Sequence, residues 1–230
     1  MAACGTKVLM LRCVEYARRY QIPIHVRSSF SNRAGTWVTD VLPPGIDTEQ
    51  TDTEGETMEQ AIISGVAQDR GEAKITVVGV PDKVGEAARI FRAIAESGIN
   101  IDMIVQNISA AATGRTDISF TLPREDGHAA MTRLGYLQDE VGFDSLLYDD
   151  RIGKVSVIGA GMRSHPGVSA TFFTALADAG VNIEMISTSE IRISVVVDES
   201  DVAMAVSAAH QAFDLGSDDE QAVVYGGTGR

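Results

Sequence analysis

The sequence has 230 residues, of which 44% carry hydrophobic side chains, and its formal net charge at pH 7 is −13. This length supports one large core or two small ones. The negative charge argues against a nucleic-acid-binding protein, because nucleic-acid phosphates require a basic protein surface. We find no apolar run long enough to span a bilayer and no signal peptide, so we expect a soluble cytoplasmic protein.

The first 44 residues predict one helix followed by a strand or two. Residues 7–21 suit one amphipathic helix, and residues 22–26 suit a short strand. The helix would have an apolar face that nothing else in this segment covers. We therefore interpret residues 1–44 as the end of another domain.

Residues 45–60 are rich in acidic side chains and contain hardly an apolar residue. Such a segment cannot bury enough apolar surface to offset the entropy lost on ordering. We predict an exposed linker here, which marks a domain boundary.

Most of the pattern of residues 74–107 recurs from residue 154 onward. In both copies a glycine, Gly85 or Gly167, precedes a helical stretch. The spacing from Gly85 to Asn100 equals the spacing from Gly167 to Asn182. A repeat of this length predicts two copies of one structural unit.

Each copy reads as strand, helix, strand, strand and helix. The predicted strands are 74–80, 101–108, 116–122, 154–160, 183–189 and 191–197, and the predicted helices are 85–97, 125–140, 167–179 and 200–213. Further strands are predicted at 61–67, 143–148 and 222–225. This order predicts the α+β class, with two ferredoxin-like βαββαβ domains in tandem.

We place the first domain at residues 61–148 and the second at residues 149–230. The strand that leads each copy leaves two arrangements open. Either 143–148 closes the first unit and 222–225 closes the second, or the strands interlock, so that chain from beyond one unit completes the other. The sequence alone does not decide between these arrangements.

The loop that ends at Gly85 carries residue types that suit an α-amino acid. The first turn of the following helix offers free N–H groups and a positive dipole end, which favour a carboxylate. Gly85 would let a ligand approach the backbone. The carboxylate of Asp82 suits an ammonium group, and the side-chain amide of Gln106 adds a donor and an acceptor.

The second copy lacks the acidic residue of this loop, because Ser164 takes the place of Asp82. If two copies pair side by side, a site can combine the acidic loop of one with the strand start of the other, at Asn182 and Ile183. Purely structural interpretations also apply. Gly85 suits a simple turn, Asp82 a helix cap or a solvated loop acid, and Asn100 a helix-ending turn.

No sequence pattern predicts catalysis. We find no phosphate-binding GxxxxGK[ST] loop, no GxSxG motif, no cluster of metal-ligating residues and no cysteine-histidine pair. Cys4 and Cys13 are expected to be reduced thiols. We therefore predict no catalytic residue, no metal and no cofactor.

Long blocks of the sequence resemble a known family. ITVVGVPDKVGEAARIF with SGINIDMIVQN, and SHPGVSATFF with VNIEMISTSEIRISVVV, resemble the paired ACT domains of the actinobacterial type of aspartate kinase (aspartokinase). The opening KVLMLRCVEYARRYQIPIHVRSSFSNRAGTWV resembles the last helix and strand of the kinase domain in that family. The resemblance covers nearly the whole chain, but not the body of a kinase domain. It implies a regulatory β subunit or regulatory region, which would not phosphorylate aspartate by itself.

The resemblance also implies partners and site residues. It implies feedback control of lysine, threonine and methionine synthesis, with threonine as the preferred effector and lysine acting in concert. It implies a homodimer through the ACT domains and a catalytic α subunit as partner. The implied effector contacts are Asp82, Gly85, Ala87 and Gln106 in the first unit and Ser169, Asn182 and Ile183 in the second. The alternative is a free-standing ACT amino-acid sensor that serves another enzyme.

Overall fold

The computed structural model describes residues 1–4, 8–39, 63–107, 113–159 and 167–216. The first two of these ranges belong to one compact unit and the others to a second. The first unit contains a short 3-10 turn η1 (Ala2–Cys4), the helix α1 (Leu11–Arg19) and an antiparallel pair of strands, β1 (Ile24–Val26) and β2 (Thr36–Val38). No residue of α1 is buried. The predicted linker at 45–60 lies outside the described residues.

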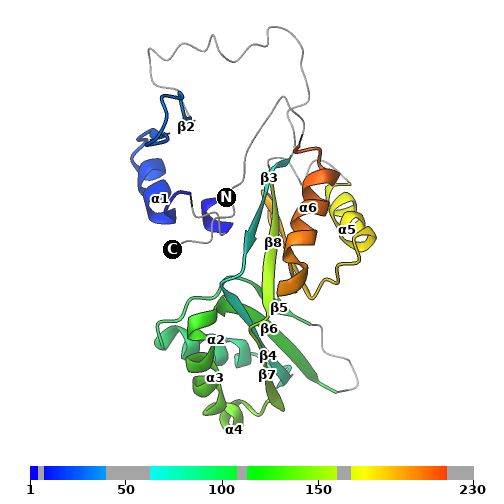
Figure 1. Cartoon of the computed structure of the whole chain (residues 1–230). Coiled ribbons are helices and arrows are strands. Elements are labelled where there is room, and N and C mark those ends of the chain that lie inside the picture. The colour runs from blue at the N-terminus through cyan, green and yellow to red at the C-terminus, as the bar shows by residue number, and fades with distance from the viewer. Residues whose placement is uncertain (5–7, 40–62, 108–112, 160–166, 217–230) are drawn as a thin grey trace. The chain divides into compact units, whose positions relative to one another are not determined.

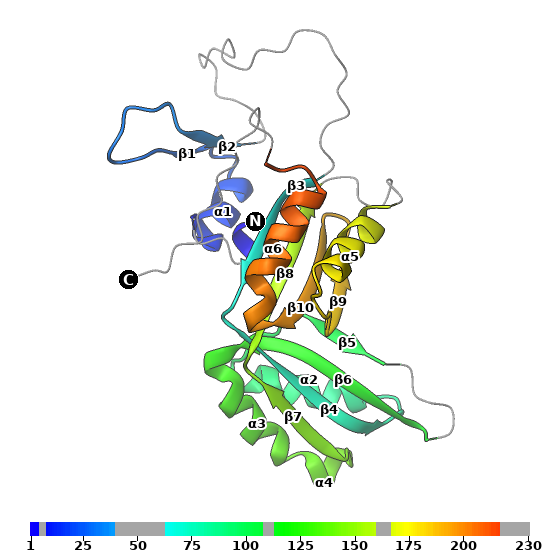
Figure 2. The same cartoon turned by 45° about the vertical axis from the view of Figure 1, so that its right-hand side comes forward.

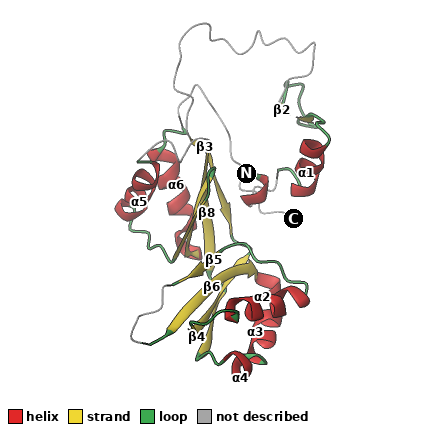
Figure 3. Ribbon diagram, turned by 180° about the vertical axis from the view of Figure 1, so that it is seen from behind, coloured by secondary structure: helices red, strands yellow, loops and turns green. Residues whose placement is uncertain are grey.

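The second unit holds two antiparallel sheets, of which the first defines domain 1. Its strands lie in the order β5-β6-β4-β7. They are β4 (Glu72–Pro81), β5 (Ile104–Gln106), β6 (Arg115–Pro123) and β7 (Ser145–Asp149). The helices α2 (Glu86–Glu96), α3 (Gly127–Gly135) and α4 (Gln138–Val141), with the turn η2 (Arg124–Asp126), complete the domain. The helices lie on one side of the sheet (Figure 3).

The second sheet defines domain 2, with strands in the order β3-β8-β10-β9. They are β3 (Ile63–Asp69), β8 (Ile152–Gly159), β9 (Met185–Thr188) and β10 (Arg192–Asp198). The helices α5 (Val168–Asp178) and α6 (Val202–Ala212), with the turn η3 (Glu199–Asp201), belong to this domain. Both helices cover the same face of the sheet (Figure 2). The predicted α+β class with two ferredoxin-like units in tandem is confirmed.

The two domains are interlocked through β3. The sequence predicts a strand at 61–67 within the first domain, but β3 pairs with β8 of domain 2 (Figure 1), with Val66 opposite Val157. Two features explain why β3 joins domain 2: which sheet edge is free to pair, and which core takes up its apolar side chains. In domain 1 the edge of β4 is already occupied by β7, whereas Ile63 and Val66 pack into the core of domain 2. The predicted strand at 222–225 lies outside the described residues.

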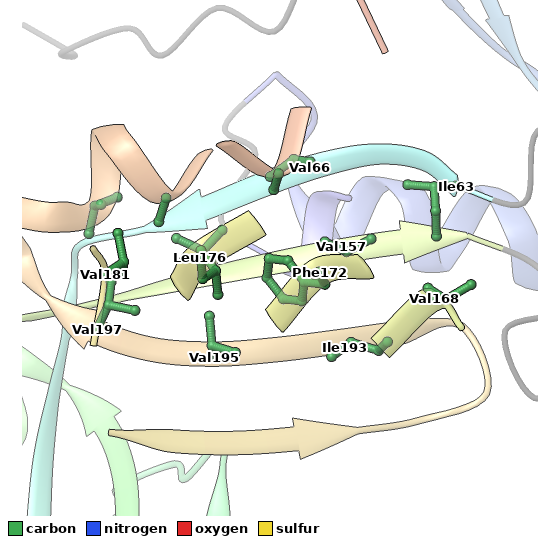
Figure 4. Close-up of a cluster of buried hydrophobic side chains, with 14 residues drawn as sticks. Ile63, Val66, Val157, Val168, Phe172, Leu176, Val181, Ile193, Val195 and Val197 are labelled. Carbon is green, nitrogen blue, oxygen red and sulfur yellow. The ribbon is translucent and has the colours of Figure 1, made fainter. Parts of the chain in front are cut away.

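Each domain has its own apolar core between sheet and helices. In domain 2, alternate residues of β8 and β10, such as Val157 and Val195, face Phe172 and Leu176 of α5 (Figure 4). Domain 1 repeats this arrangement, and Phe120 of β6 contacts Phe91 of α2 with ring centroids 5.6 Å apart. The sequence predicts one helix over 125–140, but the structure divides it into α3 and α4. Gly135, a poor helix former, ends α3.

A third apolar cluster joins the domains. Met103 of domain 1 packs with Ile152, Met185 and Val196 of domain 2. Beside this cluster lies the side chain of Lys154, which is only 2% exposed. Its ammonium group donates hydrogen bonds to the carboxylates of Glu72 and Asp102 in domain 1.

The protonation of Lys154 depends on this contact. Burial lowers the pKa of the ammonium group, but the charges and hydrogen bonds of Glu72 and Asp102 outweigh it, so the pKa is raised above the usual lysine value. The pair therefore contributes stability that is fully present below the lysine pKa of the unfolded chain. That contribution is lost as the pH rises through the higher folded pKa.

We predict that Lys154→Met lowers the free energy of unfolding by about 3 kcal/mol at pH 7, because the buried carboxylate of Glu72 is left without its cation and the more exposed Asp102 loses one of its cationic partners. Above about pH 10.5, where lysine loses its charge, the difference from the unchanged chain should shrink. Urea unfolding at pH 7 to 11 measures both effects. Arg133→Met is a matched control, because the ion pair of Arg133 with Glu96 (3.0 Å) is exposed and contributes less than about 1 kcal/mol. Equal stability of Lys154→Met and the unchanged chain at pH 7 would contradict the prediction.

Candidate functional site

The two repeated glycines begin equivalent helices. Gly85 precedes α2 with φ 103°, and Gly167 precedes α5 with φ 113°. L-amino acids with a side chain rarely adopt such values. A Cβ atom at either position would meet no atom within 4 Å, so each glycine serves the backbone conformation and not close packing. Because a glycine precedes each helix, no side chain at that position covers the first N–H groups.

Asp82 lies in the loop between β4 and α2, and its side chain is exposed. Its backbone N–H donates a hydrogen bond to the carbonyl oxygen of Gly114 (2.9 Å), which ties the loop to the start of β6. Within the described ranges no hydrogen bond or ion pair involves the Asp82 carboxylate. The residue before α2 is Gly85, so Asp82 does not occupy the capping position. Its carboxylate can therefore accept from a ligand.

Gln106 lies at the same end of domain 1. It is exposed on the edge strand β5 and pairs with Ile118 of β6. The following residue, Asn107, accepts a hydrogen bond from the hydroxyl group of Thr116 through its carbonyl oxygen. The beginning of β6 follows Gly114, whose carbonyl oxygen binds the backbone of Asp82. The same short stretch of β6 therefore positions both Asp82 and Gln106. Gly85 directly precedes α2, and Ala87 lies in the first turn of that helix.

Three polar residues that the sequence analysis missed support this loop. The N–H of Gly79 donates to Asp117 (2.8 Å), and the carbonyl oxygen of Gly79 accepts from the guanidinium of Arg115. Arg115 also forms an ion pair with Asp144 (3.0 Å). A Cβ on Gly79 would lie 2.0 Å from Asp144, so only glycine fits. Sequence spacing could not reveal these contacts, because the partners are far apart in the chain.

The predicted contacts of domain 2 lie at two ends of one helix. Ser169 is exposed on the first turn of α5, in the position that Ala87 has in α2. Asn182 and Ile183 follow the other end of α5, which is 11 residues or about 16 Å long. Asn182 is exposed, and Ile183 packs against the core of domain 2. The structure therefore separates Ser169 from Asn182 and Ile183.

The two groups of predicted contacts do not meet within one chain. Glu184, which follows Ile183, forms an ion pair with Lys74 near the beginning of β4. Asp82 lies beyond the other end of β4, eight residues and roughly 26 Å further along the strand. A site that contains both Asp82 and Asn182 therefore requires two chains.

Other kinds of site find little support in the described part of the chain. No group of three or more His, Cys, Asp or Glu side chains there could hold a metal ion. A pocket of about 390 Å³ lies along β4 and β7, and Lys74, Tyr148 and Arg151 help to line it. Lys74 lines it from the end of β4 opposite to Asp82. In the same described ranges, no helix has the length and apolar character needed to cross a membrane.

Comparison with known proteins identifies the family. The sequence profile of the ACT domain matches residues 75–135 and 155–213, which fall in domain 1 and domain 2. The chain belongs to the ACT domain family. The two ACT domains are the two copies of the sequence repeat.

Similar proteins narrow this assignment. The aspartokinase of Mycolicibacterium smegmatis is 60% identical over all 230 residues, which cover 52% of that protein. A crystal structure of aspartokinase alpha and beta subunits is 47% identical, with a TM-score of 0.62, and the match covers 66% of this chain and 99% of the other. The ligand-free regulatory subunit of aspartate kinase from Thermus thermophilus is 40% identical, with a TM-score of 0.63 and the same coverage. The ACT chain thus corresponds to the regulatory part of an aspartokinase and spans about half the length of the curated relatives it matches.

We predict that Gly85→Ala lowers the free energy of unfolding by about 1 kcal/mol, because the positive φ value strains a residue with a Cβ atom. Gly135→Ala is the matched control. It is equally uncrowded but lies in a helix, so we expect a gain of about 0.5 kcal/mol. Chemical unfolding of both variants measures these changes. A Gly85→Ala chain that is as stable as Gly135→Ala would show that φ is not the constraint.

Proposed function

We propose that this chain is the allosteric regulatory part of an aspartate kinase and binds a feedback-inhibiting amino acid between ACT domains. Threonine is the preferred effector, and lysine acts in concert with it. The observation that carries the proposal is the exposed Asp82 carboxylate, which has no hydrogen-bond or ion-pair partner among the described residues and lies in the loop before the glycine-initiated end of α2. This combination suits the ammonium and carboxylate groups of an α-amino acid.

Each group of the effector has a matching partner. Its carboxylate accepts hydrogen bonds from the first N–H groups of α2, near Gly85 and Ala87, where the helix dipole also favours negative charge. Its ammonium group pairs with Asp82. The hydroxyl group of threonine bonds to Gln106, which lies at the same end of domain 1.

The complete site uses two chains in a homodimer. Asn182 and Ile183 of domain 2 are too far from Asp82 in the same chain to share a ligand with it. Domain 1 of one chain therefore pairs with domain 2 of its partner. An effector that bridges them favours one arrangement of the chains, and such coupling is typically about 1–3 kcal/mol.

The same proposal covers the rest of the protein. Residues 1–44 are the tail of a kinase domain, 45–60 are a linker, and the ACT domains follow with β3 completing domain 2. A catalytic α subunit or domain performs the transfer of phosphate from ATP to aspartate. The assembly controls lysine, threonine and methionine synthesis in the cytoplasm. The similarity to aspartokinases over the whole chain supports the assignment of this chain to an aspartate kinase.

We predict that Asp82→Asn weakens threonine binding about tenfold or more, because a charged hydrogen bond of about 1.5–3 kcal/mol is lost. Calorimetric titration of the 230-residue chain measures the affinity. Asp139→Asn on α4 is the control, since it removes an exposed carboxylate outside the site. Unchanged threonine affinity in Asp82→Asn would remove the ammonium assignment, and lack of binding by the unchanged chain would overturn the proposed effector.

A mixing experiment tests the two-chain site. Asp82→Ala and Asn182→Ala chains should each bind threonine poorly. After they are mixed and allowed to exchange, each heterodimer regains one intact site made from the unchanged half of each chain. Titration should then show about one threonine site per heterodimer, which is half of the two sites in an unchanged dimer, and this site should have the original affinity. Binding is restored only where both halves of a site can contact the ligand at the same time. No recovery, with heterodimers shown by native mass spectrometry, would exclude a shared site.

A further inference from the structure

Four charged residues occupy equivalent positions in the two repeats. Lys74 and Lys154 each stand five residues before the first glycine of their repeat. Asp102 and Glu184 each stand two residues after the asparagine that follows the first helix. Each repeat thus supplies one lysine and one acid at matching places.

The ion pairs of these residues are exchanged between the domains. Lys74 of domain 1 donates to Glu184 of domain 2. Lys154 of domain 2 donates to Asp102 of domain 1, with 2.6 Å between Nζ and Oδ2. Each lysine therefore binds the acid of the other repeat, although the residues of one repeat would suffice for a pair within a domain.

The surroundings of the two pairs differ. The side chains of Lys74 and Glu184 are 20% and 23% exposed, whereas Lys154 is 2% exposed and contacts Glu72 as a second carboxylate. The position equivalent to Glu72 in the other repeat is the buried Ile152. Both members of the first pair therefore retain contact with water. In the second pair the ammonium group of Lys154 is enclosed, although Asp102 is 35% exposed and also lies 3.9 Å from Arg192.

The backbone N–H groups of both acids form hydrogen bonds, and both acids precede a residue of the apolar cluster that joins the domains, which we call the junction. The N–H of Glu184 donates to the carbonyl oxygen of Val196 (2.9 Å), and the following residue, Met185, lies in the cluster that joins the domains. Asp102 is held in the same way by Thr121 (3.1 Å) and is followed by Met103. A displacement of either segment must therefore alter its ion pair with the other domain.

We infer that the exchanged ion pair of Lys74 with Glu184 couples effector binding on domain 2 to the position of domain 1. This inference rests on the proposed function, because Asn182 and Ile183 directly precede Glu184 in the chain. An effector that holds these two residues also fixes the position of Glu184. Because Lys74 belongs to β4 and is paired with Glu184, the position of β4 then depends on whether the effector is bound. Lys74 and Glu184 are positioning residues, which touch no effector themselves.

Charge reversal provides the test. Lys74→Glu and Glu184→Lys should each weaken threonine binding about fivefold or more, the lower limit of typical allosteric coupling. The double variant, with the charges exchanged, should regain the original affinity to within about twofold. Arg133→Glu, Glu96→Arg and their double variant are the matched control, because this pair joins α2 and α3 within domain 1, and all three should bind threonine normally. Lys154 is not used, since its loss would destabilise the fold.

The outcomes separate this inference from the proposed function. Original affinity in both single variants, or a folded double variant that binds no better than the single ones, overturns the coupling. If the unchanged chain does not bind threonine, the proposed effector fails, and amide hydrogen exchange without ligand then tests the junction. Each single variant should speed exchange at residues 103 and 185, and the double variant should restore protection. Exchange that is unaffected by the reversals also overturns the inference.

Discussion

The interlocked strand β3 is the constraint on which the arrangement of the two ACT domains depends. The chain enters domain 2 through β3, crosses to build domain 1 and returns to complete domain 2. Both crossings are tight turns in which an aspartate accepts a hydrogen bond from the N–H two residues later, Asp69 from Gly71 (2.8 Å) and Asp149 from Arg151 (3.0 Å). Because β3 is hydrogen-bonded into the second sheet, domain 2 is incomplete until the chain on both sides of domain 1 has come together.

The repeat made the elements of each domain predictable. The sequence repeat, with a glycine before each first helix, predicts a helix at 167–179, and the structure has α5 at Val168–Asp178. The sequence patterns could not predict to which of the two sheets β3 belongs. Its apolar residues, such as Val66, suit either core, and the choice depends on which sheet edge remains open after β7 has paired. Residue patterns describe local structure and burial, but not competition between distant strands.

The candidate site shows the same limit. The chemistry of Asp82 and the end of α2 could be inferred from sequence, because carboxylates and helix ends have general properties. The separation of Asp82 from Asn182 could not, because it depends on the direction of β4 relative to the junction. Likewise, Arg115 and Asp144 support the loop between β4 and α2 from other elements of the fold. No local sequence pattern predicts these contacts.

Duplication of the fold did not produce two identical domains. Gly85 and Gly167 keep the same backbone role, since both begin a helix with a positive φ value. Side chains diverge where the domains meet: Glu72 beside the buried Lys154 corresponds to the apolar Ile152 in the other repeat. The same backbone therefore holds the enclosed Lys154 between two carboxylates, whereas its counterpart Lys74 has the single carboxylate of Glu184 and keeps contact with water.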